Sequence, residues 1–96
     1  MKIIISEIEW DTFDEDKGKI IPAEILGLPD YLELDLEEVE DYLVDYSDDG
    51  LTGEELINKA IKEGDKDAFN AVDEALSEYL LDEYAWYTSG FGIELR

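Results

Sequence analysis

From Ile20 to Asn58 the chain runs for 39 residues with thirteen carboxylates and no Lys or Arg. Over all 96 residues, 28 Asp and Glu stand against 7 Lys and Arg, so the formal net charge is −21. Like charges at this density repel one another and weaken a compact state. Because 45% of the residues are hydrophobic and 11% are aromatic, we still expect a folded domain and not a disordered acidic tail. A folded domain with this much negative charge suits a partner with a positive surface, and large positive surfaces in a cell are mostly built to hold nucleic acid.

Composition excludes several classes of function. The length predicts one domain over residues 1–96, with a modest core. The chain has no Cys and no His, so we expect no disulfide, no metal or cofactor, and no enzymatic activity of the Ser-His or Cys-His kind. The apolar run Ile3 to Ile5 is too short for a signal peptide, and no apolar stretch approaches the roughly 20 residues of a membrane span, so we expect a cytoplasmic location. With so few cations, direct binding to nucleic acid or to an anionic membrane is not expected.

Alternation of apolar and polar residues predicts three strands. They span Ile3 to Trp10, Tyr31 to Leu36 and Trp86 to Leu95, with Gly90 as the expected site of a bulge. Residues 11–19 predict a turn or hairpin loop, and residues 20–28 give no clear prediction because Pro22 cannot take a central strand position. In the first strand, one face would carry Ile4, Ser6, Ile8 and Trp10, and the other Ile3, Ile5, Glu7 and Glu9.

Apolar residues at a spacing of 3.6 predict three helices. The first runs from about Glu37 to Tyr46, the second from a capping box at Thr52 and Glu55 to about Gly64, and the third from Asp65 or Asp67 to Tyr84. Their apolar stripes are Val39, Tyr42, Leu43 and Tyr46; Leu56, Ile57, Ala60 and Ile61; and Phe69, Val72, Leu76, Tyr79 and Leu80. The predicted fold class is α+β, a small antiparallel sheet of about three strands with about three helices on one face, in the order strand, strand, helix, helix, helix, strand.

The first and third helices place carboxylates opposite their apolar stripes. Neighbours at i, i+3 and i+4 stand about 5–6 Å apart, a spacing that destabilises a helix through repulsion and that resembles the charge spacing of a phosphate backbone. Val44 and Leu81 fall on the same faces as apolar contact points. The predicted partner-binding residues are Glu37, Glu38, Asp41, Val44, Asp45, Asp48, Asp49, Glu74, Glu78, Leu81 and Asp82.

The segment from Asp45 to Gly50 is also similar to part of a calcium-binding loop. With Asp45 at position 1, Ser47, Asp49 and Gly50 take positions 3, 5 and 6 of an EF-hand. Position 12 then falls on Leu56, where a bidentate Glu is required. We interpret the segment as a turn between helices, with weak calcium binding as an alternative.

Four short motifs resemble those of small acidic proteins from phages and mobile elements: Glu9-Trp10-Asp11, Leu28-Pro29, Tyr79-Leu80 with Asp82, and Gly90-Phe91. Several inhibitors of bacterial defence, including anti-CRISPR proteins against Cas9 and anti-restriction proteins, are similar in size and acidity, and some of them mimic DNA. The resemblance implies a non-enzymatic inhibitor that fills the nucleic-acid groove of a CRISPR effector or a restriction-type enzyme. The additional helical stretch from Val39 to Asn70 departs from the pattern. An antitoxin or immunity protein against a basic nuclease is the alternative.

Overall fold

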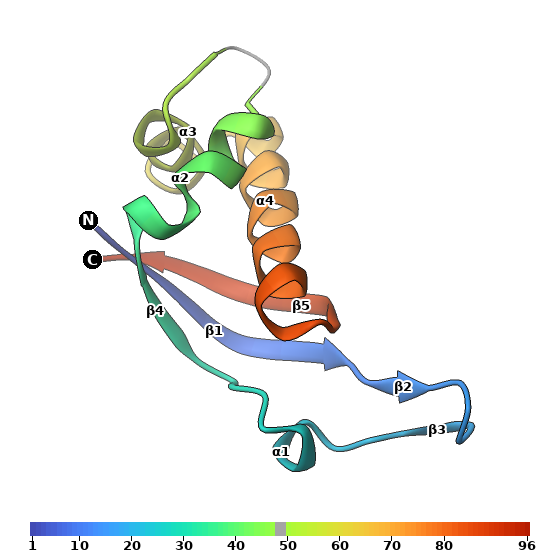
Figure 1. Cartoon of the computed structure of the whole chain (residues 1–96). Coiled ribbons are helices and arrows are strands. Elements are labelled where there is room, and N and C mark those ends of the chain that lie inside the picture. The colour runs from blue at the N-terminus through green and yellow to red at the C-terminus, as the bar shows by residue number, and fades with distance from the viewer. Residues whose placement is uncertain (48–49) are drawn as a thin grey trace.

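The chain folds into an antiparallel sheet with helices packed over one of its faces (Figure 1). The computed structural model describes residues 1–47 and 50–96. In chain order the elements are β1 (Lys2–Asp11), β2 (Phe13–Asp14), β3 (Lys19–Ile20), α1 (Ala23–Leu26), β4 (Leu32–Asp35), α2 (Leu36–Asp45), α3 (Gly53–Ile61), α4 (Lys66–Tyr84) and β5 (Tyr87–Leu95). The predicted α+β class and the three-stranded antiparallel sheet are thereby confirmed.

β1 is the central strand, and the sheet has the order β4-β1-β5. Ile4 of β1 is 1% exposed, although its cross-strand neighbours are Glu33 and Glu94. On the opposite face of β1, two apolar rows cross the whole sheet, Ile3 with Leu34 and Leu95, and Ile5 with Leu32 and Ile93. A strand that buries side chains on both faces belongs in the interior of a sheet, which explains why the run of isoleucines lies between the other two strands.

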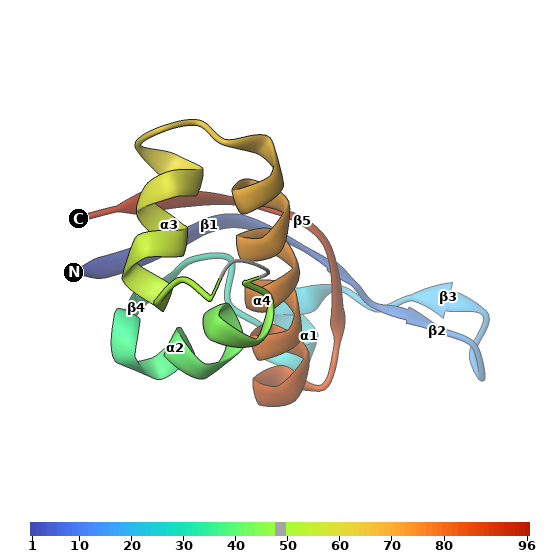
Figure 2. The same cartoon turned by 90° about the horizontal axis from the view of Figure 1, so that it is seen from above.

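Helices α2, α3 and α4 cover the face of the sheet that carries Ile3 and Ile5 (Figures 1 and 2). Burying one large aliphatic side chain stabilises the fold by about 1.5–3 kcal/mol relative to leaving it exposed. No helix of the described residues is both long and apolar enough to cross a bilayer. Side chains with 0% exposure come from all three helices, and include Val39 and Leu43 of α2, Ile57 of α3, and Val72, Leu76 and Leu80 of α4.

Helix α3 begins and ends at the predicted capping signals. The Thr52 hydroxyl accepts the backbone N–H of Glu55 at 3.2 Å, and the Glu55 carboxylate accepts the N–H of Thr52 at 3.1 Å. Asp65 accepts the N–H of Ala68 at 3.0 Å, which decides between the two predicted starts of α4. Gly64 has a φ of 70°, the left-handed conformation that lets the chain leave α3.

The predicted apolar stripe of α4 is wrong at Phe69. This side chain is 40% exposed, whereas its neighbour Ala68 is 5% exposed and Ala75 is 0% exposed. Small side chains at a helix contact allow a shorter distance between the helix axes. The core side of α4 is therefore turned toward its alanines and away from Phe69.

The predicted faces of β1 are wrong beyond Ser6, because the strand contains a bulge. Glu7 and Ile8 together oppose one residue of β5. Glu7 has a φ of 50°, in the left-handed region, and this moves Ile8 to the core face, where it is 7% exposed. A slip of one residue exchanges the two faces of a strand, so strict alternation cannot reveal a bulge. The flanking regular pairs are Ser6 with Gly92 and Glu9 with Gly90.

Trp10 connects the end of β1 to two segments that are distant in the chain. A second register shift, between Glu9 and Trp10, lies beside Gly90, where the sequence predicted a bulge. The Trp10 indole Nε1 donates a hydrogen bond to the carbonyl of Pro29 at 2.7 Å. Its ring meets Tyr84 edge to face, with centroids 5.4 Å apart. Trp10 thus links β1 to the loop before β4 and to the last turn of α4.

The predicted element order is incomplete between β1 and β4. The β2–β3 hairpin and the one-turn helix α1 occupy this stretch, so the described residues form four helices where three were predicted. Asp14 closes the hairpin, since its Oδ1 accepts the N–H groups of Asp16 and Lys17 at 2.9 and 3.2 Å. Pro22 occupies the N-cap of α1, which buries none of its side chains. A helix without a buried face leaves no hydrophobic periodicity in the sequence.

Replacing Glu7 by Gly tests the bulge. Gly adopts positive φ without a steric cost, so Glu7→Gly should raise the free energy of unfolding by about 0.5–1 kcal/mol. Glu9→Gly removes the same charge from the same strand at a residue without positive φ, and should lower that free energy by about 0.5–1 kcal/mol. Urea denaturation followed by tryptophan fluorescence measures both changes. Two changes of the same sign would contradict a bulge at Glu7.

Candidate functional site

The two predicted acidic rows lie on helices that are side by side, α2 and α4 (Figure 2). The hydroxyl of Tyr42 on α2 donates to Oδ2 of Asp82 on α4 at 2.8 Å. The Tyr42 ring meets Tyr79 of α4 edge to face, with centroids 5.6 Å apart and an angle of 82° between the rings. Tyr46, one turn further along α2, is hydrogen-bonded to Glu78 of α4. We call Tyr42, Tyr46 and Tyr79 the tyrosine seam, and it joins the two rows into one acidic surface.

The surroundings raise the pKa of all three hydroxyls in the tyrosine seam. The hydrogen bond to Asp82 is the main cause for Tyr42, whose pKa is raised to about 12. The hydrogen bond with Glu78 is the main cause of the raised pKa of Tyr46, and burial is the main cause for Tyr79. Ionisation of a phenol among carboxylates would add like charge, which disfavours it. The seam therefore stays neutral at neutral pH and supplies hydrogen-bond donors without cancelling negative charge.

The structure exposes most of the predicted contact residues. Val44 is 44% exposed. Leu81 is half-buried, so it offers a partner less apolar area than the sequence suggested. The predictions for Asp48 and Asp49 lie outside the described residues. The exposed acidic members of the set are Glu37, Glu38, Asp41 and Asp45 on α2, and Glu74, Glu78 and Asp82 on α4.

Some carboxylates of this region have partners within the chain. Glu38 accepts the N–H of Asp35 at 2.9 Å at the start of α2, and Glu40 accepts the N–H of Gly53 at 3.0 Å at the start of α3. Both bonds satisfy N–H groups that have no partner inside a helix. Asp35 also forms an ion pair with Lys2, at 2.6 Å between Nζ and Oδ1. Glu38 is therefore also a capping residue, a role that its spacing from Asp35 signals.

Cations are scarce on the acidic surface. α2 contains no Lys or Arg, and α4 contains Lys66 alone, at its first position. Ion pairs join Lys2 to Asp35 and Lys59 to Asp65, the second at 3.9 Å, and neither pair involves a residue of α2 or α4. The negative charge on the outer sides of these helices is therefore not neutralised by side chains of the same helices. Such a field attracts cationic groups over several ångströms and speeds their encounter.

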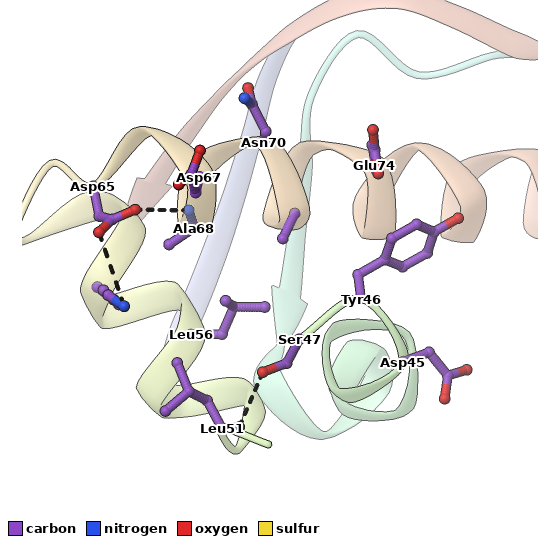
Figure 3. A pocket seen from close by; sticks show the side chains of 12 residues that line it. Asp45, Tyr46, Ser47, Leu51, Leu56, Asp65, Asp67, Ala68, Asn70 and Glu74 are labelled. Atoms are coloured by element: carbon purple, nitrogen blue, oxygen red, sulfur yellow. Dashed lines mark hydrogen bonds and ion pairs between the residues drawn. The ribbon is translucent and has the colours of Figure 1, made fainter. Parts of the chain in front are cut away.

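An open pocket of about 490 Å³ adjoins this surface, between the end of α2, α3 and the first half of α4 (Figure 3). Asp45 and Glu74 are among its lining residues, together with Lys59, and their carboxylates point outward at its rim (Figure 3). The calcium alternative would use Ser47, but its Oγ accepts the N–H of Leu51 at 2.9 Å, and Asp49 lies outside the described residues. Within the described ranges, no group of three or more acidic residues is placed to hold a metal ion.

Comparison with protein-family models, with curated proteins and with solved structures finds no match to this chain. The resemblance to phage-encoded acidic proteins therefore stays a prediction. Its motifs lie mainly in the sheet, where Glu9 pairs with Gly90 and Trp10 is bonded to Pro29. Of these motifs, Tyr79-Leu80 with Asp82 is the one that contributes to the acidic surface.

Removing the Tyr42 hydroxyl tests the tyrosine seam. A pKa of about 12, against an ordinary value of 10.0, means that the folded state holds this proton more tightly than the unfolded chain. The resulting stabilisation is fully present below pH 10 and is lost as the pH rises toward 12. Tyr42→Phe should therefore lower the free energy of unfolding at neutral pH, and its difference from the unmodified protein should shrink between pH 10 and pH 12.

Urea denaturation across this pH range, with ultraviolet titration of the phenolates, provides the measurement. Tyr87→Phe serves as the control, because it removes the same atom from a side chain that is 68% exposed and lies outside the seam. A Tyr42→Phe variant as stable as the control at neutral pH, or a deficit that does not depend on pH, would contradict the assigned hydrogen bond.

Proposed function

We propose that the protein is a non-enzymatic inhibitor whose acidic surface occupies the nucleic-acid-binding groove of a bacterial defence protein, a CRISPR effector of the Cas9 type. The supporting observation is that the tyrosine seam joins the carboxylates of α2 and α4 into one surface. Helix α2 contains no Lys or Arg that would neutralise this surface. A ridge of this kind is complementary to a groove lined by Lys and Arg. The protein acts in the bacterial cytoplasm without a cofactor.

The dimensions of the surface suit a short stretch of duplex. α4 has 19 residues and is therefore about 28 Å long, which corresponds to about eight base pairs. Packed helices have axes about 8–10 Å apart, a distance between the widths of the minor and major grooves of DNA, about 6 and 12 Å. In this proposal, the rows of negative charge on these two neighbouring helices take the place of the phosphate rows that flank a groove.

The mode of binding follows from how an effector holds its nucleic acid. A Cas9-type effector recognises the guide–target heteroduplex through the backbone and shape of that duplex, and it reads sequence only at the short PAM. Carboxylates can therefore replace phosphates in the groove without imitating any base sequence. Val44, 44% exposed between Asp41 and Asp45, adds an apolar contact that a surface selected for solubility alone does not need.

Binding to a Cas9–guide complex should be fast and salt-dependent. Because the contact replaces phosphates, we expect the affinity to fall by about tenfold or more between low and physiological salt. Fluorescence anisotropy with labelled protein at two salt concentrations measures the affinity, and displacement by a PAM-containing duplex locates the site. Absence of binding, or binding that is indifferent to salt, would count against the proposal.

Charge reversal on the acidic surface should abolish inhibition while the fold is retained. The combined variant Asp41→Lys, Asp45→Lys and Glu74→Lys changes three exposed carboxylates and should weaken binding by about 100-fold or more, because like charges then meet across the contact. Circular dichroism checks the fold, and cleavage of target DNA measures inhibition.

A matched control changes the net charge equally but leaves α2 and α4 intact. It combines Glu24→Lys in α1, Glu63→Lys after α3 and Glu94→Lys in β5, all exposed. We expect this variant to keep most of the affinity, since charges beyond about one Debye length are screened. Equal losses in the two variants would mean that net charge, and not the α2–α4 surface, determines binding.

A further inference from the structure

A second pocket, of about 350 Å³, lies beyond the C-terminal end of α4 and has aromatic walls. The end of α4, the start of β5 and the β2 strand meet at this end of the molecule (Figure 1). It is thus well separated along α4 from the pocket beside Asp45 and Glu74. Its lining residues are Asp11, Phe13, Glu15, Ala85, Trp86 and Tyr87.

The backbone of Ala85 sets the position of two of the aromatic rings. Ala85 has a φ of 62° and ends α4 in the left-handed conformation, where Gly is the usual residue. The chain turns there at once into β5, whose first residue, Tyr87, pairs with Asp11 of β1. The sheet therefore holds Trp86 and Tyr87 against the end of β1, and this side of the pocket is built on regular structure.

Two of the three aromatic side chains of this pocket are open to solvent, and Trp86 is half-buried. Phe13 is 50% exposed and Tyr87 is 68% exposed. Phe13 pairs across the hairpin with Ile20, which is 72% exposed, so the apolar area continues beyond the pocket. Contiguous exposed apolar area rimmed by polar groups marks sites of interaction.

We propose that this pocket binds the guanidinium group of an arginine side chain of a partner protein. The faces of Phe13, Trp86 and Tyr87 offer the negative potential that attracts a cation, and a planar, weakly hydrated guanidinium stacks on such faces better than an ammonium. Asp11 and Glu15 line the same pocket, and a carboxylate accepts two N–H groups of one guanidinium.

Charge selects this occupant over an apolar one. An apolar side chain in the pocket would take water away from Asp11 and Glu15 and give no hydrogen bond in return, which is unfavourable. An acidic occupant would meet both carboxylates and the net charge of −21. The proposal goes beyond the acidic surface of α2 and α4, and a small probe tests it on the isolated protein, so either proposal can fail while the other stands.

The two tryptophans provide a reporter and an internal reference. Trp86 lines the pocket, whereas the indole N–H of Trp10 is bonded to Pro29. Nitrogen-15-labelled protein is titrated with a short glycine peptide that carries one arginine, and with the same peptide carrying citrulline, which has nearly the same shape without the charge. The arginine peptide should shift the Trp86 indole signal and leave that of Trp10 in place. No shift at Trp86, or an equal shift with the citrulline peptide, would overturn the proposal.

Variants of exposed pocket residues complete the test. Tyr87→Ala and, separately, Phe13→Ala should weaken binding of the arginine peptide by about tenfold. Ile25→Ala removes a side chain that is 75% exposed and does not line the pocket, and should leave the affinity unchanged. Glu15→Gln, which keeps every ring, should also weaken binding and covers the case in which an aromatic variant fails to fold. Unchanged affinity in Glu15→Gln and in the folded aromatic variants would overturn the proposal.

Discussion

Burial of the inner sides of α2 and α4 has to outweigh the repulsion between the carboxylates on their outer sides. Each i, i+4 pair of like charges destabilises a helix by about 0.2–0.5 kcal/mol. Each fully buried aliphatic side chain, such as Leu43 or Leu76, stabilises the fold by about 1.5–3 kcal/mol. Because one buried side chain stabilises the fold by more than one like-charge pair destabilises it, 96 residues can carry a net charge of −21 and still form a core over β1.

Two acidic helices repel each other when they pack together, and the tyrosine seam places neutral hydrogen-bond donors between their carboxylates. Lysines between the rows would remove the repulsion and would also remove the negative surface. Phenol hydroxyls donate to the carboxylates and stay neutral, as Tyr42 does toward Asp82. Glu38 and Glu40 add to this arrangement by capping α2 and α3, so that part of the charge is used within the fold. The remaining exposed carboxylates form the surface offered to a partner.

The acidic rows could be predicted because their carboxylates recur with the period of a helix. The packing of α2 against α4, which brings the two rows together, could not be predicted. Tyr42, Tyr46 and Tyr79 have the spacing of core residues, and the sequence contains no sign that the hydroxyls of Tyr42 and Tyr46 reach carboxylates of a neighbouring helix. The aromatic pocket was missed for the same reason. Phe13 and Tyr87 lie far apart in the chain, and they come together only because β1 and β5 pair at Asp11.

By itself, the sequence determined the α+β class, the three sheet strands, the capping box of α3 and the acidic sides of α2 and α4. These features depend on residues that are close together in the chain, through side-chain periodicity and end capping. Only the tertiary structure decided the central place of β1, its bulge at Glu7, the β2–β3 hairpin and the contact of α2 with α4. Strand register and helix packing are set by contacts between residues distant in the chain, and the pattern of a single segment does not contain them.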